Sequence, residues 1–178
     1  GAMIDFSENG ELPLTPPFAL GDFTTACSLA AGIAAACYQQ AKTGQGERVV
    51  TSLYGQGLWA NSAVFQAVNH GNPWPKSRKL PDSPLRNTSR CKDGTWVMMG
   101  TVIYARYFPV VCKMIGREDL ISDERFNTEA AAKINSRAFV DILDEVFATK
   151  DYDEWAMLLT ENDIAYDRVN HIKDTIDD

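Results

Sequence analysis

The sequence predicts an α+β fold, mostly helical with a small antiparallel sheet. Apolar residues recur at helical spacing in several long segments, and one Asp-Gly turn separates two β-prone runs. The alternating series of strands and helices that a parallel sheet needs is absent. A chain of 178 residues, 45% of them hydrophobic and 23% charged, suits a globular protein of this class.

The first half of the chain predicts two helices. Gly1 to Met3 is interpreted as an expression-tag scar, and residues 4–20 as an extended loop. A helix of small residues is expected over 23–42, after the opener Gly21-Asp22 and before the turn Thr43-Gly44-Gln45-Gly46. Its Ala- and Gly-rich composition predicts close packing and an exposed apolar surface, Ala26 to Ala36, that needs a partner.

An extended segment, 48–53, is expected to lead to a second helix over 53–69. Ser52 is its expected N-cap, and His70-Gly71-Asn72-Pro73 its end. Residues 71–86 then predict a long irregular loop.

The second half predicts a hairpin followed by helices. Residues 87–91 and 95–101 flank the turn Lys92-Asp93-Gly94. A helix over 103–115 should close at Gly116, with Pro109 tolerated only near its first turn.

Three further elements complete the prediction. Asn127 is expected to cap one long helix, 128–149, whose apolar face comprises Phe139, Ile142, Leu143, Val146 and Phe147. Asp151 and Glu154 predict a capping box for a helix that carries Trp155, Leu158 and Leu159. Residues 164–169 should be extended, with Asn170 capping a last helix.

Composition excludes several classes of function. The net charge of −7 argues against duplex DNA or an anionic membrane as a partner. The basic cluster Lys76-Ser77-Arg78-Lys79 is interpreted as a solvated loop. The apolar stretch Ala26 to Tyr38 is shorter than the roughly 20 residues that span a bilayer, and no signal peptide is recognised.

The cysteines and histidines predict neither a disulfide nor a metal site. Cys27 and Cys37 lie about 15 Å apart along one predicted helix, and Cys91 and Cys112 show no CxxC spacing. Four reduced thiols indicate a cytoplasmic protein. His70 and His171 fall at helix boundaries without ligands at metal-site spacing.

No catalytic motif of known spacing is present: GxSxG, P-loop and GxGxxG patterns are missing. The acidic residues Asp141, Asp144, Glu145, Asp151, Asp153 and Glu154 are interpreted as helix caps and a solvated face. Arg90 and Lys92, beside the hairpin turn, have the chemistry to bind phosphate or carboxylate, but exposed charges without a ligand fit their spacing equally well.

Several motifs occur in an order that resembles the family III CoA-transferases, the CaiB/BaiF family. The first is the Gly-Asp opener with its small-residue helix and Thr-Gly-Gln-Gly turn. The others are Pro84-Leu85-Arg86-Asn87, Cys91-Lys92-Asp93-Gly94-Thr95-Trp96-Val97, the helix end at Gly116 with Arg117-Glu118-Asp119-Leu120, Asp123-Glu124-Arg125-Phe126, and Asn162-Asp163-Ile164. The resemblance covers nearly the whole chain.

The resemblance implies a dimeric two-domain enzyme that moves CoA between carboxylic acids through an aspartyl mixed anhydride. In the family, the nucleophilic Asp lies in the large domain, upstream of the Gly-Asp opener. Asp22 belongs to the opener, and Asp5 follows Ile4, so it lacks the aromatic-Asp context of the family's nucleophile. We therefore expect a fragment without a catalytic residue: 21–70 as connecting helices on the large-domain side, and 71–178 as the small α+β domain.

The resemblance also implies a ligand site and its limits. Asn87, Arg90, Lys92, Asp93 and Gly94 are the expected small-domain side of the CoA and acyl pocket, with CoA as substrate and no cofactor or metal. Lys79-Leu80-Pro81-Asp82-Ser83 stands where the formyl-CoA branch has a glycine-rich loop, which argues against formate or oxalate and for a larger acyl group. Ala165 replaces a proline usual in the family.

Three functions remain open from sequence. The first is part of a CoA-transferase, inactive by itself. The second is part of an α-methylacyl-CoA racemase of the same family. The third is a binding domain without chemistry, against which the abrupt ends at Ile4 and Asp178 and the apolar helix argue.

Overall fold

The computed structural model describes residues 15 and 17–176, in two compact units, 1–76 and 77–178. The tag scar, Asp5, Asp177-Asp178 and most of the 4–20 loop lie outside the described residues. The two units are called the N-terminal and the C-terminal unit. The division at 70/71 into connecting helices and small domain remains a prediction.

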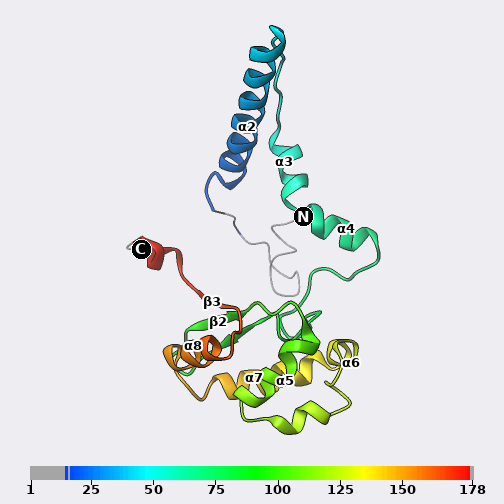
Figure 1. Ribbon diagram of the computed structural model, residues 1–178, viewed down its shortest axis with the longest axis vertical. Helices are drawn as coiled ribbons and strands as arrows, with labels where there is room; N and C mark the ends of the chain where they lie inside the picture. The colour runs from blue at the N-terminus through cyan, green and yellow to red at the C-terminus, as the bar shows by residue number, and fades with distance from the viewer. Residues whose placement is uncertain (1–14, 16, 177–178) are drawn as a thin grey trace. The chain divides into compact units, whose positions relative to one another are not determined.

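The N-terminal unit consists of helices α2 (Leu20–Thr43), α3 (Leu53–Ala60) and α4 (Ser62–Asn69) (Figure 1). The small-residue helix is confirmed and closes at Gly44, whose φ is 74° and whose N–H donates to the Gln40 carbonyl. Ser52 caps α3 as expected, with its hydroxyl accepting the Gly55 N–H.

The single helix predicted over 53–69 is wrong, because the helix breaks at Asn61. The Asn61 side-chain amide donates to the Gly57 carbonyl at 2.8 Å, and its backbone leaves the helical region at φ −101° and ψ 11°. Asparagine often competes with helical hydrogen bonding in this way. The extended segment 48–53 belongs to no strand.

Close packing of α2 is confirmed at Gly32. The segment after α2 runs back along it (Figure 1), and a Cβ placed on Gly32 would lie 2.7 Å from Val49 Cγ1. Ser28 Oγ also donates to Gln56 Oε1 at 2.6 Å, which ties α2 to α3. None of the described residues of this unit is buried, so the expected exposed apolar surface of α2 is present.

The full length of α2 exceeds the apolar stretch counted from sequence. With 24 residues, α2 is long and apolar enough to cross a bilayer by length and composition. Core helices of globular proteins meet the same test, so this criterion alone is weak evidence for a membrane span.

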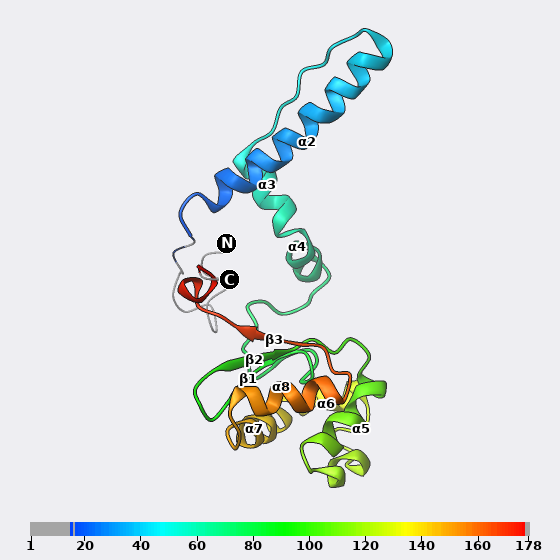
Figure 2. The same ribbon diagram turned by 60° about the vertical axis from the view of Figure 1, so that its left-hand side comes forward.

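The C-terminal unit contains the sheet. Strands β1 (Thr88–Arg90), β2 (Trp96–Met99) and β3 (Tyr166–Val169) pair antiparallel in the order β1-β2-β3. Its helices are α5 (Tyr104–Met114), η2 (Glu118–Ser122), α6 (Glu129–Ile134), α7 (Ser136–Phe147), α8 (Tyr152–Glu161) and η3 (Ile172–Thr175). Figure 2 shows α5, α7 and α8 together on one side of the sheet. The predicted α+β class, mostly helical with a small antiparallel sheet, is confirmed.

The core lies between that side of the sheet and the helices. Its largest fully buried side chains are Trp155, Phe126, Phe139, Phe147, Leu85, Met99, Leu120, Leu143 and Leu159. The predicted apolar face of α7 is confirmed, because Phe139, Leu143 and Phe147 are buried while Ile142 and Val146 pack against them half-buried. The predicted capping box of α8, Asp151 with Glu154, is also present.

Four details of the predicted helices are wrong. Pro109 lies inside α5 beyond its first turn, where burial of Phe108 and Val111 offsets the lost hydrogen bond. Thr128, not Asn127, caps the next helix, and Asn135 divides the predicted long helix into α6 and α7 by donating its side-chain amide to the Ala131 carbonyl. His171, not Asn170, precedes the last short helix, η3.

Candidate functional site

The β1–β2 hairpin forms the floor of the site. Gly94 takes φ 87° in its turn, a conformation that side chains with a Cβ disfavour. The Gly94 N–H donates to the Cys91 carbonyl at 3.0 Å, and the Cys91 N–H donates to the Thr95 carbonyl at 2.8 Å. The turn therefore holds the side chains at the end of β1 in a fixed position.

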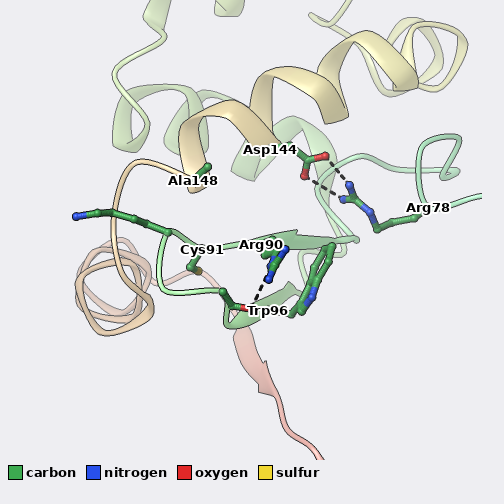
Figure 3. A pocket seen from close by; sticks show the side chains of 8 residues that line it. Arg78, Arg90, Cys91, Trp96, Asp144 and Ala148 are labelled. Atoms are coloured by element: carbon green, nitrogen blue, oxygen red, sulfur yellow. Dashed lines mark hydrogen bonds and ion pairs between the residues drawn. The ribbon is translucent and has the colours of Figure 1, made fainter.

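An open pocket of about 570 Å³ lies between this hairpin and the C-terminal end of α7 (Figure 3). Its lining combines charged, aromatic and small residues: Arg78, Arg90, Cys91, Lys92, Gly94, Trp96, Asp144 and Ala148. We call it the hairpin pocket. It lies entirely within the C-terminal unit.

One wall of the hairpin pocket is an ion pair between Arg78 and Asp144. Both guanidinium Nη atoms donate to the Asp144 carboxylate, and Nη1 also donates to the Thr88 carbonyl at 2.6 Å. The guanidinium carbon lies 5.2 Å from the centroid of the Trp96 ring, within the range of a cation–π contact. Arg78 thus joins the loop before β1 to both the hairpin and α7.

The basic cluster at 76–79 is therefore not the solvated loop that the sequence predicted. Lys79 Nζ donates to Asp141 at 2.5 Å and to Asp144 at 2.6 Å, so two cations of the cluster meet two carboxylates of α7. The hydrogen bonds that Lys79 donates to Asp141 and Asp144 raise the pKa of Lys79. Burial opposes the ionised form of Asp144, but the hydrogen bonds from Arg78 and Lys79 outweigh it and lower the pKa of Asp144.

Arg90 and Lys92 are the exposed cations of the hairpin pocket. In the described part of the chain, neither side chain forms an ion pair. Arg90 Nε donates to the Gly94 carbonyl at 3.3 Å, and a Cβ on Gly94 would lie 3.3 Å from Arg90 Nη2. The absence of a side chain at Gly94 leaves room for the guanidinium.

Asn87 and Asp93 have structural partners. Asn87 Nδ2 donates to the Arg78 carbonyl at 2.9 Å, which fixes the start of β1. The Asp93 carboxylate accepts the Thr95 N–H at 2.9 Å and the Tyr152 N–H, the first of α8, at 3.1 Å. These backbone hydrogen bonds lower the pKa of Asp93. The structure thus places Arg90, Lys92 and Gly94 in the pocket lining. Asn87 and Asp93 instead form hydrogen bonds with the backbone around the pocket.

The thiol in the lining favours no nucleophilic chemistry. Burial, followed by the nearby Asp93 and Asp151, raises the pKa of Cys91 to about 11, so the thiol stays protonated at neutral pH. All four cysteines are free, as predicted. Among the described residues, no three His, Cys, Asp or Glu side chains gather as a metal site would require.

Sequence reasoning missed Arg78, Trp96 and Asp144 in this lining. Arg78 and Asp144 lie 66 positions apart, so no local spacing connects them. The one available signal was complementary charge: two cations at 78 and 79, and two carboxylates at 141 and 144, one helical turn apart.

The whole chain, residues 1–178, matches the family model described as CoA-transferase family III. The chain belongs to this family. A curated relative, (R)-2-hydroxy-4-methylpentanoate CoA-transferase of Clostridioides difficile, is 34% identical over 178 residues, which are 100% of this chain and 45% of that protein. Cinnamoyl-CoA:phenyllactate CoA-transferase of Clostridium sporogenes is 30% identical over 177 residues, 96% of this chain and 42% of that protein.

Solved structures share the fold of this chain. The orthorhombic crystal form of Rv3272 from M. tuberculosis superposes with a TM-score of 0.82 at 21% identity, over 100% of this chain and 46% of that one. A CAIB/BAIF family protein from Brucella suis gives 0.76 at 23% identity, over 100% of this chain and 47% of that one. The family III chain thus spans less than half the length of the relatives it matches.

Proposed function

We propose that this chain is part of a CoA-transferase that moves CoA between carboxylic acids. The observation that carries the proposal is the family match over the whole chain, together with relatives named as CoA-transferases. In this proposal the chain is a fragment that supplies the connecting helices and the small domain. The hairpin pocket then forms the small-domain side of the CoA and acyl site.

The reaction would proceed by attack of an Asp on the acyl thioester. The Asp carboxylate displaces CoA thiolate and forms a mixed anhydride with the donor acyl group. The thiolate would then attack the aspartyl carbonyl, which releases the donor acid and leaves an aspartyl-CoA thioester. The acceptor carboxylate would attack that thioester to form a second anhydride, and CoA thiolate would attack its acceptor acyl carbon, which gives the new acyl-CoA and frees the Asp carboxylate. We place this Asp in the part of the parent protein outside this chain. Asp22 is exposed in the first turn of α2, a position that suits a helix N-terminus. CoA is then a substrate, and the reaction needs no cofactor.

The acids are proposed to be larger than formate. Both relatives above are named for the CoA transfer of 2-hydroxy acids, 2-hydroxy-4-methylpentanoate and phenyllactate. We extend that class to the parent of this chain, together with a cytoplasmic homodimer as its working form. The exposed apolar residues of the N-terminal unit, among them Phe23, Leu53 and Trp59, support a protein partner surface there.

The test follows acyl-CoA products by mass spectrometry. The parent protein and this chain are each incubated with an acyl-CoA and free 2-hydroxy-4-methylpentanoate. The proposal expects the new CoA ester with the parent and none with the chain alone. Formation by the chain alone would place the nucleophile within it.

A racemase of the same family is the alternative. It exchanges the α-proton of an acyl-CoA, so the parent would incorporate deuterium from D₂O at that carbon without any acceptor acid. Deuterium exchange without CoA transfer would replace the transferase proposal, and the absence of both reactions would favour a binding domain.

A further inference from the structure

We propose that the hairpin pocket is a phosphate-binding site whose ligand contacts are Arg90 and Lys92. The inference deepens the proposed function, and it rests on that function only for the source of the phosphate. The site would be complete within the C-terminal unit and would bind a phosphate group in the absence of the rest of the parent protein.

The charges of the pocket lining favour binding of an anion. The chain as a whole is acidic, with a net charge of −7, yet the pocket lining holds three cations and one carboxylate. Arg78 and Asp144 neutralise each other in their ion pair. Arg90 and Lys92 remain as an unneutralised pair of cations in an open pocket, an arrangement that attracts an anion.

The negative groups near the pocket are occupied elsewhere. At the C-terminal end of α7, the Asp144 carbonyl accepts the Ala148 N–H, the Val146 carbonyl accepts the Thr149 N–H, and the Phe147 carbonyl accepts the Trp155 indole N–H. The Asp93 carboxylate accepts two backbone N–H groups, one of them at the start of α8. Hydrogen bonds therefore satisfy these oxygens, but Asp93 keeps its charge and acts together with Asp151 on Cys91 in the lining. The attraction for an anion comes from the side chains of Arg90 and Lys92.

Within the proposed CoA and acyl site, the shape and lining of the hairpin pocket suit a phosphate group better than the acyl chain. Acyl chains bind in enclosed, mostly apolar pockets, whereas this pocket is open and its lining is mixed. Lysine binds phosphate as a point charge, and the arginine fork matches two phosphate oxygens. Trp96 adds an aromatic surface beside the cations. The phosphate could belong to the nucleotide end of CoA or to a free phosphate compound.

The experiment is an NMR titration of the ¹⁵N-labelled chain. The probes are adenosine 3′,5′-bisphosphate, CoA, inorganic pyrophosphate and pantetheine, which lacks phosphate. We expect a phosphate probe to shift amide signals of residues 90–96, and pantetheine to shift none of them. Arg90→Gln and Lys92→Gln should each weaken binding about tenfold, the effect of losing one charge-assisted hydrogen bond.

Matched controls lie elsewhere on the same unit. Arg137→Gln and Lys113→Gln remove exposed charges outside the hairpin pocket, and neither should change the affinity. Shifts with CoA and the bisphosphate support CoA as the source, while shifts with pyrophosphate alone support a free phosphate compound. The proposal is overturned if no phosphate probe shifts these signals, if pantetheine shifts them equally, or if both variants bind as the wild type does.

These outcomes are separate from the proposed function. If the parent transfers CoA but this chain binds no phosphate, only the proposal of a phosphate site in the hairpin pocket is overturned. If this chain binds phosphate but the parent has no transferase activity, only the proposed CoA-transferase function is overturned.

Discussion

At the scale of residues, the hairpin pocket depends on where charges are paired and where they are not. Asp144 holds Arg78 and Lys79, so these cations act as structure and not as ligand contacts. Arg90 and Lys92 carry the charge that is open to a ligand. The site residues close in sequence could be predicted from the Lys-Asp-Gly turn. The Arg78–Asp144 wall could not, because only the folded chain brings positions 66 apart into contact.

Asp144→Asn tests whether the ion pairs of Asp144 with Arg78 and Lys79 stabilise the fold. The variant keeps the size of the side chain but loses its charge, so we expect the free energy of unfolding to fall by about 1 kcal/mol at pH 7, a value reduced for partial exposure. Urea denaturation measures it. The matched control Asp141→Asn, at a carboxylate that is 50% exposed with a single ionic partner, should cost less than about 0.5 kcal/mol.

The same pair has a predictable pH dependence. Because the folded state lowers the pKa of Asp144, its contribution is complete above the unfolded value of about 3.9 and is lost as the pH falls through the lower folded value. The difference between wild type and Asp144→Asn should therefore shrink when urea denaturation is repeated below pH 4. A constant difference down to pH 2 would contradict the ion-pair account.

At the scale of elements, helix ends with a cap could be predicted, whereas breaks inside an apolar pattern could not. Gly44, Gly71 and Gly116 all adopt positive φ where a helix was expected to end. Asn61 and Asn135 interrupt helices whose apolar periodicity continues across them, so the apolar pattern did not predict these breaks. In both cases the side-chain amide bonds a carbonyl of the preceding turn.

The junction of α7 and α8 is the element contact with the clearest expected cost. Trp155 is 1% exposed, donates its indole N–H to the Phe147 carbonyl at 2.9 Å, and has its ring centroid 4.5 Å from that of Phe147. Trp155→Phe leaves a buried carbonyl without its donor, so we expect a loss of about 2 kcal/mol in chemical denaturation followed by circular dichroism. Trp59→Phe, at a side chain 75% exposed, should change stability by less than about 0.5 kcal/mol. Equal effects of the two substitutions would refute this packing.

At the scale of the whole molecule, the two units differ in how they are stabilised. The C-terminal unit has a continuous apolar core, whereas none of the described residues of the N-terminal unit is buried. The small residues of α2 predicted an exposed apolar surface on that helix but not the difference in burial between the two units. The sequence could not show how far the helix would extend, because its ends at Leu20 and Thr43 depend on local hydrogen bonds.

Hydrogen exchange of the isolated chain measures how the two units differ in stability. Amides of residues 20–69 should exchange much faster than those of β2, α7 and α8, because exposed helices open with little loss of buried surface. Comparable protection in both units would show that the N-terminal unit is covered, for example by a second copy of the chain.

The most direct test of the account is steady-state kinetics of the parent protein carrying Arg90→Gln and Lys92→Gln together. If this chain contributes ligand binding and not the nucleophile, the KM for the acyl-CoA should rise at least tenfold while kcat and the KM for the acceptor acid stay near the wild-type values. A fall in kcat with an unchanged KM would place these side chains in the chemistry. No change in either constant would remove the hairpin pocket from the CoA site.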